Sequence, residues 1–538
     1  MKKKVVYIVL AFNILTSVFL NFYKQNDSPP CMNADEVAYG YNAYSILKTG
    51  KDEYGKFLPL RFKSFEDYKL PLYGYLSVPF IKIFGLNEFS TRLLNKLVGI
   101  AYVPLVFLIS MELFGITAIT LIATTLTSIE PWIYIMTRHA HEGELAALFT
   151  LAALYFLIRY MKKKSFKDFL FINISLLLLS FSYHTGRLFL LFFAAYQGWL
   201  MIAGRKKGFL KENASKLIII FAVVCIPFFV DFKYGANRVQ RLFFTQNAGF
   251  QMRITEYLNE HPLRAMHNKL TEGIKSITNN YFGQLSPDFF FIWGDRNWRF
   301  GFNGFSILTP VEYLLFFVGL YYFFQNKFKY RWLILFLFLI TPLNNALTWQ
   351  EYSLIRTYFL IFPIVFIVSY GVYHLFLSFK NVRVRNISFV IIAGAFLFFI
   401  SQSWDFYFFH YSKRAAIVRA WQCGYKEVVQ YVKENYDKFD TFVMTERYGQ
   451  PYIFFLYYLQ YPPEKYQKQA SLSIIDDYGF GEVDKFDKFD FKFDFDPEAR
   501  RTSFIGYPDQ LGEHIGNMNL IKTIKVKGEE IFWIYEAN

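Results

Sequence analysis

Residues 93–114 (LLNKLVGIAYVPLVFLISMELF) and 116–135 (ITAITLIATTLTSIEPWIYI) decide the fold class of this chain. Both are as long as the run of about 20 apolar residues with which an α-helix crosses the hydrocarbon core of a bilayer. The rest of the sequence contains further apolar runs at 5–22, 145–161, 169–183, 188–203, 217–230, 311–324, 332–347, 358–379 and 387–404. The sequence therefore predicts a mainly α fold, a polytopic transmembrane bundle of about eleven helices.

The composition agrees with a membrane protein. Of 538 residues, 21% are aromatic, which exceeds what one soluble core buries, and only 19% are charged, which is too little to cover a soluble surface of this size. The formal net charge of +15 would also suit a nucleic-acid-binding protein. The cytoplasmic loops of a multi-span membrane protein acquire the same excess, and we favour this explanation.

Basic residues orient the bundle. Met1 and three lysines precede the first apolar run, and no small-residue cleavage site follows it, so we interpret the run as a retained signal anchor. With the N-terminus inside, the most basic loops, 159–167, 205–216, 327–331 and 380–385, lie in the cytoplasm. The opposite short loops carry single arginines, namely Arg138, Arg187 and Arg356. An odd number of spans then places the C-terminus outside the cytoplasmic membrane.

We expect two domains. Residues 1–404 form the transmembrane domain, with large outer loops at 23–88 and 231–310, and residues 405–538 form a small extracytoplasmic α/β domain. Within the second domain, the apolar pattern predicts helices near 425–436 and 450–461 and strands near 441–445, 503–506, 520–526 and 531–535. The tract 484–496 alternates phenylalanine with charge, a pattern that predicts one amphipathic strand.

The three cysteines, Cys31, Cys225 and Cys423, lack the spacing of a metal site or of a disulfide framework. Cys225 lies within an apolar run, and a bridge between Cys31 and Cys423 is only a conjecture at this point. The cysteine pattern therefore identifies no site.

Charged residues near the apolar runs lie toward the ends of those runs: Lys96, Glu112, Glu142, Glu144, Arg187, Asp231, Glu312 and Arg356. An ion-coupled transporter would instead need ionisable groups near the bilayer midplane. The charges at outer ends converge with those of the first large loop, namely Asp35, Glu36, Glu66, Asp67 and Lys69. Cations that hold an anionic leaving group and carboxylates that activate a hydroxyl suit a reaction on a lipid-linked phosphate.

The segment Asn33-Ala-Asp35-Glu36 precedes a helical pattern that runs through Lys48 and ends at Gly50. Adjacent acids at such a position are candidates for catalysis, but they also favour the helix macrodipole without any further role. Both explanations stay open on the sequence alone.

Lys69 precedes the apolar run 76–84, which is too short to cross the membrane and suits an interfacial helix. Its ammonium would lie at the level of the phosphate headgroups, where it is a candidate for binding a phosphate. The alternative is a lysine that only extends its charge to the interface.

The segment Arg138-His-Ala-His-Glu142-Gly-Glu144 lacks the spacing that places two histidines on one helix face, so we do not expect a zinc site. Arg138 and Glu142 would alternatively form a helix-surface pair. Tyr183-His184-Thr-Gly-Arg187 and Arg356 lie in short outer loops where topology requires no positive charge, so we expect a binding role for them.

In their order and on this face of the membrane, these motifs resemble the GT-C superfamily of integral-membrane glycosyltransferases that use polyprenyl-phosphate sugars. The similarity is greatest to the group of protein O-mannosyltransferases, lipid A aminoarabinose transferases and Rgt-type glycosyltransferases, and it covers roughly residues 1–400. The matching features are Asp35-Glu36 after the first span, Lys69-x-Pro71-Leu72-Tyr73, Phe84-Gly85-x-Asn87-Glu88-Phe89-x-x-Arg92-Leu93, Pro131-Trp132 with Arg138 and Glu142, and Tyr183-His184-x-x-Arg187-Leu188. Two departures are Tyr68, where the family often has an acid, and Leu70, where it usually has proline.

The resemblance implies a role for each matched residue. Asp35 would be the general base, assisted by Glu36, and Glu142 would be a second catalytic acid in the cavity. Lys69 and Arg138 would bind the donor phosphate, and Tyr73, Tyr183 and His184 would bind the substrate. Arg187 and Arg356 join the phosphate-binding set because of their loop positions. Asp35 would also hold a divalent ion, Mg²⁺ or Mn²⁺ rather than Zn²⁺, because carboxylate ligands favour these ions, and no organic cofactor is expected.

We therefore expect an inverting glycosyltransferase that moves a hexose or pentose from a polyprenyl-phosphate carrier to an extracytoplasmic lipid, glycan or protein. Its partners would be the lipid-linked sugar, membrane lipid and the acceptor, with no nucleic acid. Two alternatives stay open, a flippase or other transporter of lipid-linked saccharides and a membrane scaffold without catalytic activity. The C-terminal domain and the segment Gly294-Asp295-Arg296-Asn-Trp298-Arg299 lie outside the common catalytic core and are candidates for choosing the acceptor.

Overall fold

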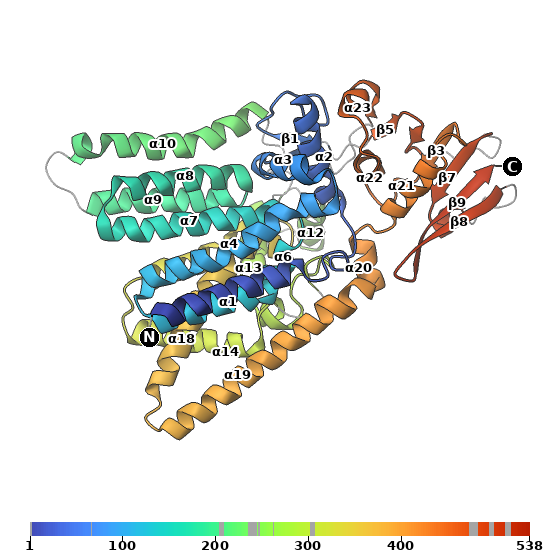
Figure 1. Ribbon diagram of the computed structural model, residues 1–538. Helices are drawn as coiled ribbons and strands as arrows, with labels where there is room; N and C mark the ends of the chain where they lie inside the picture. Colours follow the sequence, from blue (N-terminus) through green and yellow to red (C-terminus); the bar gives the residue numbers. More distant parts are fainter. Residues whose placement is uncertain are drawn as a thin grey trace. The chain divides into compact units, whose positions relative to one another are not determined.

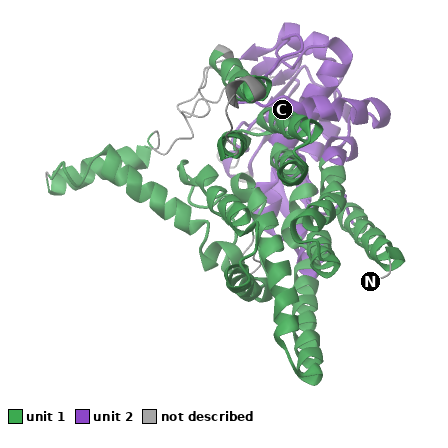
Figure 2. Cartoon of the chain, turned by 90° about the vertical axis from the view of Figure 1, so that its left-hand side faces the viewer, with its two compact units in different colours: residues 1–23, 95–137, 142–404 green, residues 24–94, 138–141, 405–538 purple. Residues whose placement is uncertain are grey.

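The computed structural model describes residues 3–65, 67–203, 209–234, 245, 248–261, 263–301, 307–472, 483–493, 500–511 and 518–537. The chain divides into two compact units (Figure 2). Unit 1 contains residues 1–23, 95–137 and 142–404, and unit 2 contains residues 24–94, 138–141 and 405–538. One boundary coincides with the one drawn from the sequence, after residue 404, whereas most of the first outer loop groups with residues 405–538.

Unit 1 is built of helices (Figure 1). Those long and apolar enough to cross a membrane are α1 (Lys3–Phe22), α4 (Glu88–Phe114, which belongs to unit 1 from Asn95 on), α7 (Glu142–Lys163), α9 (Gly186–Ala203), α10 (Phe209–Tyr234), the run of α17 (Leu354–Thr357) and α18 (Ile361–Ser378), and α19 (Val382–Asp405). α5 (Thr117–Ile129) and α6 (Pro131–Thr137) form a further candidate if the 48° bend between them lies within one span. Among the described residues, seven or eight helices thus meet this test.

The remaining apolar runs are helical but shorter. They form α8 (Phe166–Ser182), α14 (Pro310–Gln325), and α15 (Arg331–Ile340) followed by α16 (Leu343–Ala346). Each apolar run found in the sequence is therefore helical, which confirms the mainly α membrane fold, while the total of about eleven spans stays a prediction. The second outer loop contributes α12 (Ala248–Glu260) and α13 (Lys269–Gly283).

Small and polar residues let the helices of unit 1 approach one another, as expected where lipid leaves little hydrophobic force between helices. Where α14 meets α18, a Cβ on Gly319 would lie 2.1 Å from the carbonyl oxygen of Ile367, so only glycine fits. Between α1 and α5, Asn13 Nδ2 donates to Thr125 Oγ1 over 3.1 Å. α7, α8 and α9 lie side by side (Figure 1), and two of them begin with candidate site residues.

The first outer loop supplies the N-terminal part of unit 2. It forms α2 (Ala34–Thr49), the antiparallel pair β1 (Phe62–Ser64) and β2 (Asp67–Lys69), and α3 (Leu72–Phe84). α2 ends at Gly50, whose φ of 70° is the left-handed conformation that closes a helix, so both predicted ends of this helix are confirmed. The run 76–84 lies within α3 and is helical as expected.

The C-terminal part of unit 2 contains a seven-stranded sheet of order β4-β5-β6-β3-β7-β9-β8. The elements are α20 (Ala415–Ala420), α21 (Tyr425–Glu434), β3 (Thr441–Met444), α22 (Pro451–Tyr458), α23 (Pro463–Gln469), β4 (Ser471–Leu472), β5 (Val483–Phe486), β6 (Phe489–Asp490), β7 (Thr502–Gly506), α24 (Pro508–Leu511), β8 (Met518–Val526) and β9 (Glu529–Ala537). β3 pairs in parallel with β6 and β7, and the other pairings are antiparallel. The predicted strand-containing domain is therefore present.

The tract 484–496 corrects one prediction, because it forms two strands rather than one. β5 and β6 pair antiparallel, with Phe486 opposite Phe489. Asp487 between them has a φ of 51°, the left-handed conformation that a two-residue hairpin turn requires and that aspartate tolerates. Alternation of phenylalanine with charge suits one long strand and a hairpin equally well, so the pattern alone does not locate the turn. Residues 494–496 lie outside the described residues.

Candidate active site

The first turn of α2 carries the two adjacent acids, and local side chains determine how the helix begins. Asn33 is the N-cap, and its Oδ1 accepts hydrogen bonds from the backbone N of Asp35 at 3.0 Å and of Glu36 at 3.3 Å. Glu36 Oε2 accepts in return from Asn33 N at 3.2 Å, which completes a capping box. The capping box therefore fixes the backbone from which the Asp35 side chain projects.

Glu36 is completely buried. Its Oε1 accepts from Arg92 Nε and from Ala140 N, each at 2.8 Å, and its Oε2 accepts from Arg92 Nη2 at 2.8 Å. A buried carboxylate is stable only when an opposite charge and hydrogen bonds compensate for lost water, and Arg92 supplies both. Since its oxygens already serve these donors, the environment favours a positioning role for Glu36 over the predicted direct part in catalysis.

Asp35 and Lys69 form an ion pair within unit 2. Lys69 Nζ donates to Asp35 Oδ1 over 2.7 Å. The Lys69 side chain is 6% exposed, whereas that of Asp35 is 46% exposed, so the carboxylate is open to solvent and the ammonium is shielded. The predicted proximity of this acid and this cation is therefore found. Glu66 and the side chain of Asp67 lie outside what the structure describes.

Aromatic rings enclose the Lys69 ammonium. Its Nζ lies 4.8 Å from the centre of the Tyr39 ring and 5.0 Å from that of Phe65, within the range at which rings attract a cation. Tyr73 packs against Tyr39 with 4.9 Å between ring centres, and its hydroxyl donates to Thr91 O over 3.1 Å. Because Tyr73 is fully buried, it supports Tyr39 and offers no surface for the predicted substrate contact.

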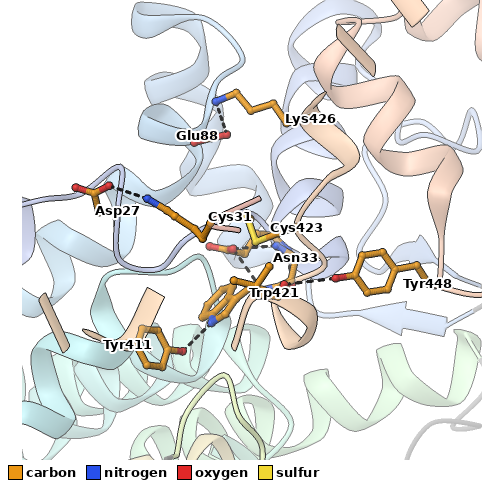
Figure 3. Close-up of a disulfide and its surroundings, with 12 residues drawn as sticks. Asp27, Cys31, Asn33, Glu88, Tyr411, Trp421, Cys423, Lys426 and Tyr448 are labelled. Atoms are coloured by element: carbon orange, nitrogen blue, oxygen red, sulfur yellow. Dashed lines mark hydrogen bonds and ion pairs between the residues drawn. A yellow bond between two sulfur atoms is a disulfide. The ribbon is translucent and has the colours of Figure 1, made fainter. Parts of the chain in front are cut away.

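A disulfide joins the start of α2 to the C-terminal part of unit 2 (Figure 3). Cys31 and Cys423 are bonded across 392 positions of sequence, so the bridge conjectured from the sequence is present. Beside it, Gln422 Oε1 accepts from Ala34 N over 2.8 Å, and Trp421 Nε1 donates to Tyr411 Oη over 2.7 Å. The segment that carries Asp35 is thus tied to residues 421–423. Such a bridge is typical of proteins outside the cytoplasm.

Arg138 is buried in unit 2 and donates to the backbone. Its Nε and Nη2 donate to Ser28 O over 2.9 and 2.6 Å, and Nη2 also donates to Lys24 O over 3.1 Å. The guanidinium packs against the rings of Tyr407 and Phe408. With only 1% of the residue exposed, these contacts favour a structural role over the predicted binding of phosphate.

The other candidates lie in unit 1. Glu142, in the first turn of α7, is buried, and the connection between α8 and α9 contains buried Tyr183 and half-buried His184. Arg187, in the first turn of α9, forms a bidentate ion pair with Asp231 of α10, with nitrogen–oxygen distances of 2.5 and 2.9 Å. A guanidinium engaged by both oxygens of one carboxylate favours the packing of α9 against α10 over the predicted binding of phosphate.

Arg356 lines a small, open pocket in unit 1. Its Nη1 donates to Thr348 Oγ1 over 2.8 Å and to Asn345 Oδ1 over 3.2 Å. The other walls are small or largely apolar, from Gly143, Ala146, Ala147, Thr150, Leu179, Thr185, Gly186, Phe189, Ile355, Tyr358 and Phe359.

Asp295 stabilises the segment that carries Arg356. Its Oδ2 accepts from the backbone N of Leu354 over 2.7 Å, at the beginning of α17, and its Oδ1 accepts from Asn297 N over 2.8 Å. Burial raises the pKa of Asp295 to about 6, even though these hydrogen bonds and the charge of Arg356 act in the opposite direction. Asp295 therefore holds the beginning of α17 in place through its hydrogen bond from Leu354 N.

A divalent ion finds few protein ligands in the described part of the chain, where no group of three or more His, Cys, Asp or Glu side chains is arranged to hold a metal. Glu36 is engaged by Arg92, and Asp35 shares one oxygen with Lys69. Mg²⁺ is often bound by one or two carboxylates, with water and substrate phosphate completing its shell. Asp35 fits Mg²⁺ or Mn²⁺ in this mode, and the described residues do not fit a multi-ligand Zn²⁺ site.

The fold and these residues define the class of protein. The sequence model of the family described as dolichyl-phosphate-mannose-protein mannosyltransferase matches residues 69–230. Solved structures of the same architecture are glycosyltransferases of the GT-C superfamily. The chain is therefore a multi-pass membrane protein with the GT-C glycosyltransferase fold, and the resemblance seen in its sequence is confirmed.

Particular solved structures match most of the chain. ArnT from Cupriavidus metallidurans in the apo state gives a TM-score of 0.53 at 9% identity and covers 97% of both chains. The same protein bound to undecaprenyl phosphate gives 0.51 at 10% identity, covering 99% of this chain and 98% of ArnT. Archaeal oligosaccharyltransferase AglB from Archaeoglobus fulgidus, in complex with an inhibitory peptide and a dolichol-phosphate, gives 0.51 at 14% identity over 85% of this chain, which spans 64% of the AglB chain. No curated protein sequence matches the chain.

Sequence reasoning missed the roles of Arg92 and Gln422. Arg92 is visible in the sequence as part of the motif that begins at Phe84, but nothing local pairs it with Glu36. Gln422 has no sequence signal except its position beside Cys423, and its partner Ala34 is 388 positions away. Both residues act through contacts that only the fold brings together.

Proposed function

We propose that the protein is an inverting glycosyltransferase that moves a sugar from a polyprenyl phosphate to an acceptor hydroxyl outside the cytoplasm. The observation that carries the proposal is the pair of Asp35 and Lys69, in which a solvent-accessible carboxylate lies 2.7 Å from a shielded ammonium. Transfer from a lipid phosphate needs a base for the hydroxyl and a cation for the leaving phosphate. This pair supplies both beside one helix terminus.

In the proposed reaction, Asp35 accepts the proton of the acceptor hydroxyl while the hydroxyl oxygen attacks the anomeric carbon of the sugar. The bond between that carbon and the phosphate oxygen breaks, and its electron pair stays on the polyprenyl phosphate, which leaves. Lys69 stabilises the charge of this phosphate. One displacement inverts the configuration at the anomeric carbon and requires no covalent enzyme intermediate.

We further propose that the carrier is a phosphate of the undecaprenyl or dolichyl type. The likeness of fold to ArnT with undecaprenyl phosphate and to AglB with a dolichol-phosphate supports a donor of this class. Arg138 and Arg187 are left out of the proposed donor site, because carbonyl groups and Asp231 already engage them.

Two features support a reaction on the extracytoplasmic side of the cytoplasmic membrane. Basic loops predict that the N-terminus is inside, which would place residues 23–88 and 405–538 outside. The Cys31–Cys423 disulfide of unit 2 is typical of an oxidising compartment. A Mg²⁺ or Mn²⁺ ion, if the reaction uses one, would be held by Asp35, and it would supply further positive charge to the phosphate.

The test compares Asp35→Asn and Lys69→Met with Lys82→Met, a matched control at the exposed end of α3. Purified proteins are incubated with a polyprenyl-phosphate sugar and a cell-envelope extract that supplies acceptor hydroxyls, and the released polyprenyl phosphate is measured. We expect the two site variants to fold normally, as judged by size-exclusion chromatography, and to lose release, while the control keeps it. Release that survives in Asp35→Asn would contradict the proposal.

The same preparations separate the two alternative functions. A flippase would move the lipid-linked sugar between leaflets of a vesicle without releasing polyprenyl phosphate, and a scaffold would do neither. The donor and acceptor are best identified by mass spectrometry of the polyprenyl-linked sugars that accumulate in a deletion strain. We expect one sugar-phosphate lipid to accumulate there and to be consumed by the purified wild-type protein.

A further inference from the structure

We propose that the charge state of Glu53 controls how well Lys69 binds the donor phosphate. Uncharged Glu53 leaves the Lys69 ammonium available to the phosphate, whereas ionised Glu53 competes with the phosphate for the ammonium. The inference rests on the proposed function of Lys69. It assigns Glu53 as a positioning residue that acts through Lys69 and does not touch the reacting atoms.

The first observation is the burial of the Glu53 side chain. Glu53 follows α2 in the turn of residues 52–56, and the residue is 1% exposed. Its backbone N donates to Asn42 Oδ1 over 3.0 Å, which holds the turn against α2. The side chains of Tyr452 and Asn42 face the carboxyl group and partly stabilise its charge, but among the described residues neither carboxyl oxygen makes a hydrogen bond of good geometry. An ionised carboxylate left in this state is costly, and a protonated one is far less so.

The second observation is the set of groups around Glu53. Titratable side chains face it from each element packed there: Asp52 and Tyr54 in the same turn, Tyr41 of α2, Lys69 of β2, Tyr452 of α22 and Tyr466 of α23. Burial raises the pKa of Glu53 well above its usual value, and the charge of Asp52 raises it further, while Lys69 opposes the shift. Lys69 is thus the positive group whose attraction for a phosphate would weaken when Glu53 ionises.

The chemical consequence follows from counting charges. With Glu53 uncharged, the net charge of Lys69 and ionised Asp35 is zero, and the donor phosphate approaches a cation that is paired with one carboxylate. Ionisation of Glu53 adds one negative charge beside Lys69, and this charge repels the phosphate. Charges in a shielded site interact more strongly than charges in water, so we expect donor affinity to fall about tenfold when Glu53 ionises.

The proposed test is the pH dependence of the Michaelis constants of the full-length protein. In the wild type, the KM for the polyprenyl-phosphate sugar should rise about tenfold at alkaline pH, while the KM for the acceptor should not follow it. In Glu53→Gln, which cannot ionise, the donor KM at alkaline pH should stay within about twofold of its value at neutral pH. A role in structure alone would not move the pH profile of one substrate only.

Asp52→Asn is the matched variant from the same turn, and it also covers the case in which Glu53→Gln fails to fold. Its amide oxygen can still accept the turn hydrogen bonds from Tyr54 N and Lys56 N. Because the Asp52 charge favours protonation of Glu53, this variant should show the alkaline rise in donor KM at a lower pH than the wild type.

Three results would overturn the inference: an alkaline rise that persists in Glu53→Gln, a rise shared by donor and acceptor, or an Asp52→Asn profile that does not move. These outcomes differ from failure of the proposed function itself. That failure would appear as a wild type without donor consumption, or as donor consumption that survives in Lys69→Met.

Discussion

Two ion pairs, one in each unit, have similar nitrogen–oxygen distances and differ in how far their carboxylates are exposed to solvent. In unit 2, Asp35 meets Lys69 through one oxygen, and its side chain is 46% exposed. In unit 1, Asp231 meets Arg187 through both oxygens, and its side chain is 14% exposed. The first carboxylate has an accessible face for a substrate hydroxyl, whereas the second is committed to a bidentate pair. An acid suited to proton transfer is thus recognised by the solvent exposure of its carboxylate beside a shielded cation.

The largest expected effect comes from the same substitution in both pairs. Asp35→Asn should lower kcat for sugar transfer by about a thousandfold, because it removes the proposed general base. Its cost in stability should be the smaller of the two, since the amide Oδ1 can still accept from Lys69 and two aromatic rings hold the ammonium. Asp231→Asn should lower stability by about 2 kcal/mol, since it leaves Arg187 without its charged partner, and should change kcat by less than about tenfold. Rates and thermal midpoints of both variants, measured in the same detergent, check this contrast. Similar losses of kcat in both would break the comparison.

The next effect tests whether the neighbouring acid, Glu36, is held for positioning. Arg92→Met should destabilise the protein by about 3–5 kcal/mol, because it leaves a buried carboxylate without its cation. The double variant Arg92→Met with Glu36→Gln should recover most of that stability, since the uncompensated charge is then absent. Thermal unfolding of the two variants provides the measurement. A double variant that is no more stable than the single one would contradict the role assigned to Glu36.

The distance along the chain between contacting residues explains which features could be predicted from the sequence. The beginning and end of α2 were predictable, because Asn33, Glu36 and Gly50 act on their own immediate backbone. The helices of the apolar runs were also predictable, because length and hydrophobicity are properties of the local sequence. The partners of Arg138 and the Cys31–Cys423 bridge join positions more than 100 residues apart, and no periodicity encodes such contacts. The resemblance predicts Arg138 as a phosphate ligand, and its hydrogen bonds to the backbone carbonyls of Ser28 and Lys24 are visible only in the fold.

A smaller effect concerns Asp295, an acid of unit 1 that is buried without a salt bridge in the described contacts. Because burial raises its pKa from 3.8 to about 6, the folded state binds its proton more tightly than the unfolded state does. Stability should therefore decrease as the pH rises from about 4 to about 6, by about 3 kcal/mol, and then level off. Asp295→Asn cannot ionise and should lack this part of the decrease. Thermal midpoints of both proteins across this pH range isolate the contribution, and equal slopes would contradict it.

The smallest expected effect concerns metal, and it sharpens the difference between the two pairs. Lys69 already provides a positive charge beside Asp35, so a bound Mg²⁺ or Mn²⁺ would add to an existing cation rather than replace a missing one. Chelation with EDTA should lower transfer by only about three- to tenfold, and Mg²⁺ should restore it better than Zn²⁺, because a single carboxylate with water and phosphate suits the harder ion. In Asp231→Asn the response to EDTA should equal that of the wild type, since the proposed ligand of the ion is Asp35. Unchanged transfer would remove the metal from the mechanism, whereas a thousandfold loss would mean that the ion, and not Lys69, is the principal cation for the leaving phosphate.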